Sequence, residues 1–278
     1  MIIWIASYPK SGNTWIRSFL ISLLSGKDLD INNLSLIPQY PKEEHFKEIT
    51  NNVNDIIEVS KKWIKSQEII NKDKKIKFFK THNMLCNIGD NYFTNEKNTL
   101  GSIYIVRDPR NIITSLKNHY QFEDYKDAIN FMFDEKKYLG SKYNTGEKLV
   151  PTLIGSWKSN YNSWKILTKN LLLIKYENLI DNEFSEFKKI SNYIENMLGK
   201  KFKESEIKNA INNSSFSNLK KMENENGFVE SPTNKKTGNK QTFFNLGPKN
   251  KWENLLENQL VEQIESEFSV EMKELDYI

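Results

Sequence analysis

The stretch that decides the fold reads Ser7-Tyr8-Pro9-Lys10-Ser11-Gly12-Asn13-Thr14-Trp15. A short apolar run at residues 2–6 precedes it, and apolar residues at helical spacing follow it as far as Gly26. This pattern predicts a buried strand, a tight loop and a helix. A loop that leaves a strand and opens a helix presents backbone N–H groups at the positive end of the helix dipole. Such a loop favours an anion.

The residue types of this loop suit a single phosphate. Gly12 lets the backbone approach an anion, Asn13 and Thr14 add side-chain donors, and Lys10 adds a mobile positive charge. The Walker A loop of nucleotide triphosphatases needs two glycines and places its lysine after the last one. Here the lysine precedes the glycine, so a phosphate that carries a leaving group fits better than a triphosphate. An ordinary strand-to-helix turn with Lys10 in solvent is the alternative.

The rest of the chain alternates between strand and helix patterns. Further strands are expected at 76–79, 103–106 and 171–174, and helices at 53–66, 109–120, 124–138, 153–168, 184–198 and 253–275. Asp108 is the expected N-cap of the helix that begins at Pro109. Residues 30–50 are expected to be irregular, and residues 223–242 to form a mobile loop. The alternation predicts an α/β fold in which a parallel central β-sheet is flanked by helices on both faces.

Composition sets further limits. A chain of 278 residues, 38% hydrophobic, can build one sizeable core, and no repeat or linker divides residues 1–278 into several domains. A net charge of +4 argues against a nucleic-acid partner. Cys86 is the sole cysteine, which indicates a reducing compartment. The longest apolar run is too short for a membrane span and no signal peptide is recognised, so we expect a cytoplasmic protein.

Two more polar segments end predicted strands. The first is Lys80-Thr81-His82, and the second begins at Arg107, with Ser115 eight residues later in the next helix. Arg107 can bind a phosphate in a bidentate manner while Ser115 donates from the helix, or Arg107 can pair with Asp108 or another carboxylate.

Histidine suits proton transfer because its unperturbed pKa lies near neutral pH. His82 is the preferred candidate for that role. His119 competes with it because it lies four residues beyond Ser115 on the same helix face. His45 has no supporting context.

Together these segments resemble the sulfotransferases that use 3'-phosphoadenosine 5'-phosphosulfate (PAPS) and release 3'-phosphoadenosine 5'-phosphate (PAP). The first loop is similar to their 5'-phosphosulfate loop, Tyr-Pro-Lys-Ser-Gly-Thr-Thr-Trp, and departs from it at Asn13. Arg107 and Ser115 match the spacing of the family's 3'-phosphate segment, and the segment ending in His82 matches its Lys-Thr-His. The family continues with Leu-Pro where this chain has Asn83-Met84.

The resemblance implies a single sulfotransferase domain with the P-loop, nucleotide-kinase-like fold. It implies transfer of the sulfuryl group from PAPS to a hydroxyl or amine of an acceptor, with PAP as product. His82 would take the acceptor proton, Lys10 would face the leaving oxygen and Lys80 the sulfuryl oxygens, with Ser115 as a fourth catalytic residue. The residues implied for the nucleotide are Lys10, Ser11, Gly12, Asn13, Thr14, Trp15, Arg107, Ser115, Tyr176, Ser214, Phe216, Asn245, Leu246 and Gly247.

Several of these assignments rest on looser matches. Tyr176 resembles a tyrosine near the adenine in the family and could equally be a core aromatic, as could Trp15. Ser214 replaces a threonine that frames the base together with the phenyl ring at Phe216. The family has Arg-Lys-Gly where this chain has Asn245-Leu246-Gly247, so both charges are missing. Either Lys249 or Lys251 replaces them, or the affinity for the 3'-phosphate is lower.

Two other classes of function remain. A kinase of small molecules would share the architecture but need ATP and magnesium, whereas sulfuryl transfer requires no metal because the sulfuryl group carries less charge. A catalytically silent PAP-binding protein would bind the nucleotide without transfer. The acceptor, a small molecule or a glycan, would be enclosed by residues 30–50, 83–95, 120–150 and 223–242. The oligomeric state is left open.

Overall fold

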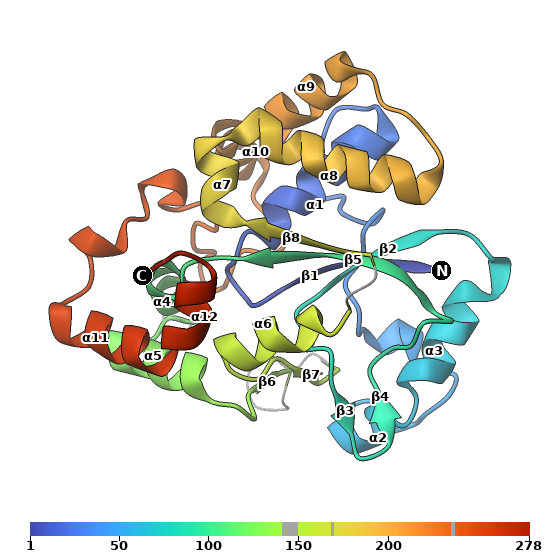
Figure 1. Ribbon diagram of the computed structural model, residues 1–278, viewed down its shortest axis with the longest axis horizontal. Helices are drawn as coiled ribbons and strands as arrows, with labels where there is room; N and C mark the ends of the chain where they lie inside the picture. Colours follow the sequence, from blue (N-terminus) through green and yellow to red (C-terminus); the bar gives the residue numbers. More distant parts are fainter. Residues whose placement is uncertain (141–149, 168–169, 235–236) are drawn as a thin grey trace. The chain divides into compact units, whose positions relative to one another are not determined.

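The computed structural model describes residues 1–140, 150–167, 170–234 and 237–278 (Figure 1). Its central sheet has four strands in the order β2-β1-β5-β8. These are β1 Ile2–Ser7, β2 Lys77–Thr81, β5 Thr99–Val106 and β8 Leu171–Lys175. Strand β1 pairs in parallel with both β2 and β5. The predicted strands and the α/β class with a parallel central sheet are therefore confirmed.

The described residues group into two compact units, each assembled from three segments. The first unit comprises Met1–Tyr8, Ile37–Val106 and Met132–Leu173, and the second comprises Pro9–Leu36, Arg107–Phe131 and Ile174–Ile278. The chain leaves the first unit directly after β1 and β5, where the polar loops begin. That residues 1–278 form one domain stays a prediction.

The first unit holds most of the sheet and an aromatic core. Trp4 of β1 packs against Tyr40 and Phe93 with ring centroids 5.4 and 5.3 Å apart. Tyr104 of β5 donates from its hydroxyl to Asn160 of α6, 2.8 Å away. The other elements of this unit are α2 Ile56–Ser60, α3 Trp63–Ile70, α6 Trp157–Lys165, the 3₁₀ turns Glu43–His45 and Asn71–Asp73, and two hairpins, β3 Asn87–Ile88 with β4 Asn91–Tyr92 and β6 Tyr138–Leu139 with β7 Thr152–Leu153.

The second unit is helical. Helix α1 Asn13–Ser25 ends as predicted at Gly26, whose φ of 64° lets its N–H return to Ser22. Helix α4 Pro109–Tyr120 begins as predicted, with the Asp108 side chain accepting from the N–H of Arg110. The others are α7 Tyr176–Asp181, α8 Glu183–Leu198, α9 Glu204–Asn213, α10 Phe216–Asn226, α11 Asn258–Glu267, α12 Ser269–Glu274 and the 3₁₀ turns Gly247–Lys249 and Trp252–Asn254. Helix α5 Tyr125–Phe133 ends just past the unit's second segment.

Several predicted helices have different bounds. The helix predicted at 53–66 is two, α2 and α3, and the one at 253–275 divides at Phe268, whose ring is buried at the junction of α11 and α12. The helix predicted at 124–138 ends at Phe133, and the one at 153–168 begins at Trp157. Its last residue, 168, lies outside the described residues.

Residues 223–242 are in part helical, contrary to expectation. Their first four residues complete α10, and one isolated bridge joins Thr233 to Lys240. Residues 235–236 of this segment, and 141–149 of the expected acceptor segment, lie outside the described residues. In the part of the chain that is described, no helix is both long and apolar enough to cross a membrane.

Candidate functional site

The loop after β1 forms an uncapped helix N-terminus. Lys10 and Gly12 have positive φ angles of 68° and 101°, and α1 begins at the next residue, Asn13. The carbonyl of Gly12 accepts from the N–H of Trp15 at 3.0 Å, so the helix starts directly from the loop. Gly12 offers no side chain to cap the first turn, and that turn carries no acidic residue. The arrangement leaves a binding element for an anion.

Ser11 supplies the clearest sign of a ligand at this loop. Its side chain is buried, and its hydroxyl has no hydrogen-bond partner among the described residues. A buried hydroxyl left unpaired costs about 1–3 kcal/mol. The indole N–H of Trp15 is buried without a partner in the same way. The Ser11 hydroxyl can donate, so an anion bound at the loop would satisfy it.

The side chains of Tyr176 and Arg107 both contact the loop. A Cβ atom on Gly12 would lie 2.5 Å from the ring of Tyr176, so that ring packs directly on the glycine. The guanidinium of Arg107 lies 4.1 Å from the centre of the same ring and donates to the carbonyl of Lys10 at 3.1 Å. Trp15 meets Tyr176 edge-on, at 5.7 Å between ring centres. Arg107 and Tyr176, predicted to bind the nucleotide, therefore lie together at the phosphate loop.

Ser115 is held by a neighbour that the sequence did not single out. Asn250 is buried and donates from its amide to the Ser115 hydroxyl at 3.2 Å and to the carbonyl of Asn111 at 2.9 Å. Thr114 donates to the amide oxygen of Asn250 at 2.6 Å. The amide of Asn250 therefore orients the serine that α4 presents.

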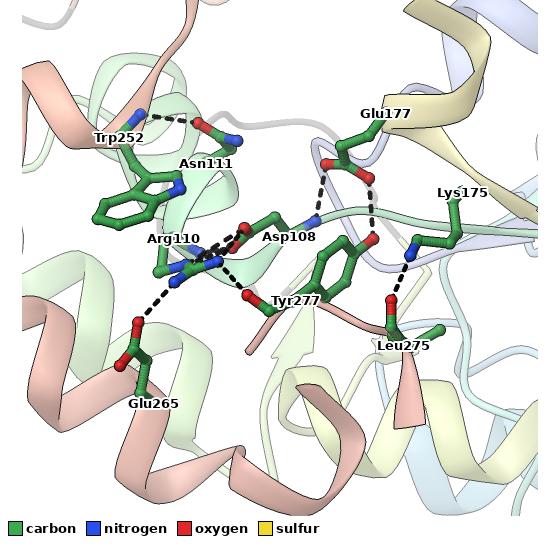
Figure 2. Close-up of polar contacts among 9 residues, drawn as sticks. All are labelled: Asp108, Arg110, Asn111, Lys175, Glu177, Trp252, Glu265, Leu275 and Tyr277. Atoms are coloured by element: carbon green, nitrogen blue, oxygen red, sulfur yellow. Dashed lines mark hydrogen bonds and ion pairs between the residues drawn. The ribbon is translucent and has the colours of Figure 1, made fainter. Parts of the chain in front are cut away.

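Asp108 pairs with Arg110 (Figure 2). The Arg110 guanidinium donates to both oxygens of Asp108, to Glu265 of α11 at 2.5 Å and to the carbonyl of Tyr277 at 2.9 Å.

Lys10 lies between two rings. Its ammonium is 3.5 Å from Nδ1 of His119 and 4.0 Å from the ring centre of Phe243. The two rings meet edge-on, 5.9 Å apart. His119 is thus brought to the phosphate loop, as its position on the Ser115 face of α4 suggested.

A second cluster forms at Phe216 and Gly247. A Cβ atom on Gly247 would lie 2.3 Å from the Phe216 ring, so the glycine is required for this close approach. Leu246, beside it, is partly exposed. The Ser214 hydroxyl donates to the carbonyl of Ala210 at 2.8 Å and ends α9. Because the Ser214 hydroxyl already donates its proton, it could contact the base of the nucleotide only as an acceptor.

His82 and Lys80 belong to the first compact unit. Nδ1 of His82 lies 2.8 Å from the carbonyl oxygen of Ser7 and 3.3 Å from its hydroxyl. A carbonyl can only accept, so Nδ1 carries the proton and the lone pair resides on Nε2. That tautomer is the one a general base needs. Asn160 anchors the backbone by donating to the carbonyl of His82 at 3.0 Å. Lys80 is buried at the end of β2.

Comparison with known proteins identifies the family. A sequence model described as the sulfotransferase domain matches residues 2–276. The chain belongs to the sulfotransferase family. Among its relatives, sulfotransferase 1B1 of Mus musculus is 23% identical over 274 residues, which are 97% of this chain and 82% of the relative. Flavonol 3-sulfotransferase of Flaveria bidentis is 20% identical over 272 residues, 95% and 79% of the two chains.

Solved structures share the fold of this sulfotransferase. Mouse sulfotransferase SULT7A1, solved in complex with PAP, superposes with a TM-score of 0.59 at 19% identity, covering 99% of this chain and 84% of its own. Retinol dehydratase, solved in complex with androsterone and the inactive cofactor PAP, also has a TM-score of 0.59, at 17% identity and with coverages of 98% and 80%. At these identities the likeness establishes the fold.

Sequence reasoning missed Lys220 in this sulfotransferase. Its ammonium donates to the carbonyl of Asn245 at 3.1 Å and lies 5.8 Å from the ring centre of Phe216. It therefore brings a positive charge to the segment where the family's Arg-Lys pair is absent. The signal available in the sequence was its position one helical turn after Phe216. Lys249 and Lys251, the predicted substitutes, are exposed on the surface.

Two other groups of this sulfotransferase are made inert by burial. Burial lowers the pKa of His45 to about 4, so this ring stays neutral. Burial raises the pKa of the Cys86 thiol to about 12, which disfavours the reactive thiolate. Among the described residues, no group of three or more His, Cys, Asp or Glu side chains could hold a metal ion.

Proposed function

We propose that this sulfotransferase transfers the sulfuryl group of PAPS to a hydroxyl or amine of an acceptor and releases PAP. The observation that carries the proposal is the buried, unpartnered Ser11 hydroxyl at the uncapped N-terminus of α1. A buried donor without a partner at a helix N-terminus supports a phosphate ligand at this loop. The family and the PAP complexes of proteins with the same fold support the choice of nucleotide.

The residues of the second unit fit the two ends of this nucleotide. The loop from Lys10 to Thr14 would hold the 5'-phosphosulfate through backbone N–H groups and the Ser11 hydroxyl. Arg107 and Ser115 would hold the 3'-phosphate, because a guanidinium and a hydroxyl can both donate to phosphate oxygens. Trp15, Tyr176, Ser214 and Phe216 would frame the base, and the segment 245–247 would border the 3'-phosphate.

PAPS supplies a sulfuryl group whose S–O bond to the 5'-phosphate breaks as the acceptor oxygen forms its own S–O bond. His82 takes the acceptor proton on Nε2, since the bond from Nδ1 to the Ser7 carbonyl orients the ring. Lys10 stabilises the charge that grows on the departing phosphate oxygen, which keeps the electron pair of the broken bond. Lys80 steadies the sulfuryl oxygens, and Ser115 positions the nucleotide.

The remaining assignments belong to the same proposal. The chain would act in the cytoplasm as a single domain on a small-molecule or glycan acceptor, without a metal ion, a nucleic acid partner or a membrane span. A kinase and a silent PAP-binding protein are the alternatives that the experiment must separate.

Nucleotide-dependent thermal unfolding tests the proposal. PAP in large excess over its dissociation constant should stabilise the protein by about 3 kcal/mol at a hundredfold excess, whereas ATP with magnesium should not. Radiolabelled PAPS should then transfer its sulfuryl group to a panel of hydroxyl and amine acceptors in the presence of EDTA. Stabilisation by ATP–magnesium alone would establish the kinase, and PAP binding without transfer to any acceptor would establish the silent binder.

A further inference from the structure

Helix α6 is hydrogen-bonded to the stretch of chain that follows β2 and begins with His82. The Asn160 amide donates to the carbonyl of His82 at 3.0 Å, and the Trp164 indole donates to the carbonyl of Asn83 at 3.1 Å. The two donors are four residues apart, so they lie on one face of the helix. Helix α6 therefore binds two successive backbone carbonyls, the first of which belongs to the proposed base.

The residues after His82 have further bonds to α6 and to β7. The hydroxyl of Ser163 in α6 accepts from the N–H of Leu85 at 2.9 Å. The N–H of Met84 donates to the carbonyl of Leu153 in β7 at 2.8 Å, and the N–H of Leu153 donates to the side chain of the preceding residue, 83, at 2.9 Å. Because both elements bind this stretch, its backbone has little freedom to shift.

The amide of Asn160 is fully hydrogen-bonded. Its nitrogen also donates to the carbonyl of Ile154 at 2.8 Å, and its oxygen accepts from the Tyr104 hydroxyl at 2.8 Å. Carbonyl oxygens only accept, so these partners decide which end of the amide faces His82. Burial raises the pKa of the Tyr104 hydroxyl well above its usual value, so its proton remains available to Asn160. The completely buried side chain thus has one orientation.

Two bonds restrain His82 at opposite ends of the residue. Asn160 binds its carbonyl, and the ring is bound through Nδ1 to the carbonyl of Ser7 at 2.8 Å. A shift of the main chain would strain the second bond, because the ring moves with the backbone that carries it. A displacement of about 1 Å in a reacting group can cost about a hundredfold in rate. The contact at the carbonyl therefore affects the nitrogen that would take the proton.

We propose that Asn160 is a positioning residue for His82 and that Trp164 assists it. By binding the two carbonyls, these side chains hold the imidazole so that Nδ1 keeps its proton on the Ser7 carbonyl and Nε2 accepts the proton of the acceptor. Both act through the backbone and not by contact with the acceptor. The inference rests on the proposed sulfuryl transfer, in which His82 is the base.

Asn160→Ala tests the role in turnover. It should lower kcat about tenfold to a hundredfold and leave PAP affinity unchanged, since the base alone is displaced. Gln67→Ala is the matched control, because Gln67 is also completely buried in the first unit and its amide donates to the carbonyl of Phe93 at 2.6 Å. Both variants should lose stability in urea, but Gln67→Ala should keep its kcat. Rates are measured with saturating labelled PAPS and the acceptor that the panel of hydroxyls and amines identifies.

A conservative pair of variants keeps the test independent of the stability of Asn160→Ala. Trp164→Phe removes the indole N–H and keeps an aromatic ring, and it should lower kcat about threefold, the equivalent of one modest hydrogen bond. Trp63→Phe loses the same atoms from another buried ring. In the part of the chain that the structure describes, the Trp63 indole N–H has no hydrogen-bond partner. Trp63→Phe should therefore leave kcat unchanged.

Nitrogen NMR of the histidine rings tests the positioning without turnover. The chain has three histidines, so a ring label gives few signals, and His82→Ala identifies those of His82. At pH 8, above the ordinary histidine pKa of about 6.5, the PAP-loaded wild type should carry the His82 proton on Nδ1. Asn160→Ala and Trp164→Phe should show a mixture of the two tautomers, and both controls should match the wild type.

The outcomes separate this inference from the proposed function. If Asn160→Ala loses no more kcat than Gln67→Ala, the positioning role is overturned. It is also overturned if His82 keeps its wild-type tautomer in both Asn160→Ala and Trp164→Phe, or if the wild type itself carries the proton on Nε2. If the wild type binds no PAP or transfers no sulfuryl group, the proposed function falls, and the spectra alone decide whether α6 holds the ring.

Discussion

The hydrogen bond from His82 Nδ1 to the Ser7 carbonyl decides which ring nitrogen can accept a proton. His119 is in a different position, because a second positive charge on its ring would lie 3.5 Å from the Lys10 ammonium. At the scale of single residues, these contacts support separate proposed roles: His82 as the base, and His119 as the residue that positions Lys10.

The first prediction compares these residues. His82→Ala should lower kcat by about 100-fold or more, the usual contribution of a general base, with PAP affinity nearly intact. Lys10→Ala should lower kcat and weaken PAP binding together. His119→Ala should lower kcat less than His82→Ala. Rates measured with saturating PAPS and dissociation constants from calorimetry provide the check, and a fully active His82→Ala would reverse the assignment.

The second prediction concerns the missing Arg-Lys pair. The Lys220 ammonium donates to the carbonyl of Asn245, in the segment proposed to border the 3'-phosphate. Lys220→Ala should therefore weaken PAP binding about tenfold, the value of one charge-assisted hydrogen bond. Binding of adenosine 5'-phosphate, which lacks the 3'-phosphate, should not change. Lys221→Ala is the control, since that residue is exposed and near Glu225 on the same helix. If Lys220→Ala and Lys221→Ala bind PAP equally well, while Lys249→Ala or Lys251→Ala binds it more weakly, then Lys249 or Lys251 replaces the missing pair.

At the scale of elements, the loop and α1 depend on one glycine. Gly12 and Gly26 both have positive φ, but a Cβ on Gly12 would strike the Tyr176 ring, whereas a Cβ on Gly26 would meet nothing within 4 Å. Gly26→Ala should therefore lower the free energy of unfolding only by the cost of a positive φ angle at alanine, about 1–2 kcal/mol. Gly12→Ala should destabilise the protein further and abolish PAP binding. Urea unfolding measures the stability of both variants, and calorimetry measures their PAP binding. Equal losses of stability in the two variants would contradict the close packing of Gly12 against the Tyr176 ring.

The chain end is tied to α4 by Arg110 (Figure 2). Its side chain is buried with Asp108 and also pairs with Glu265. Arg110→Ala should cost about 3 kcal/mol or more, since it leaves a buried carboxylate without its partner. Lys65→Ala removes an ion pair with Glu68 in which both side chains are exposed, 63% and 54%, and it should cost about 1 kcal/mol or less. Similar losses in the two variants, measured by urea unfolding, would contradict the anchoring role.

At the scale of the whole molecule, Glu177 makes stability depend on pH. Burial is the main cause that raises the pKa of this carboxyl above its usual 4.5, although it accepts from the Asp108 N–H and the Tyr277 hydroxyl. The folded chain then holds this proton more tightly than the unfolded chain does. Its contribution to stability is complete below 4.5 and is lost as the pH rises through the folded-state value.

The stability difference between wild type and Glu177→Gln measures that contribution. The difference should shift in favour of the variant as pH rises from 4 to 8, because glutamine cannot ionise. Glu257→Gln, at an exposed position, should show no such trend. Urea unfolding across this pH range gives both curves, and parallel curves for wild type and Glu177→Gln would contradict the burial effect.

Local residues allowed part of this structure to be predicted. The loop after β1, the stop of α1 at Gly26 and the start of α4 at Asp108 each depend on the geometry of a few adjacent residues. Glycine, proline and a capping carboxylate restrict the backbone wherever they occur. The end of α5 at Phe133 and the division of α11 from α12 at the buried Phe268 were misplaced by periodicity alone, because tertiary packing overrides local preference.

The amino-acid order by itself determined the parallel sheet, the tight loop before α1 and the start of α4 at Asp108, because these follow from patterns within about ten residues. Only the tertiary structure decided which partners meet: Asn250 with Ser115, Lys220 with Asn245, and His119 with Lys10. Those pairs are 135, 25 and 109 residues apart. Contacts at such separations form when burial of the apolar core brings segments together, and no local preference encodes them.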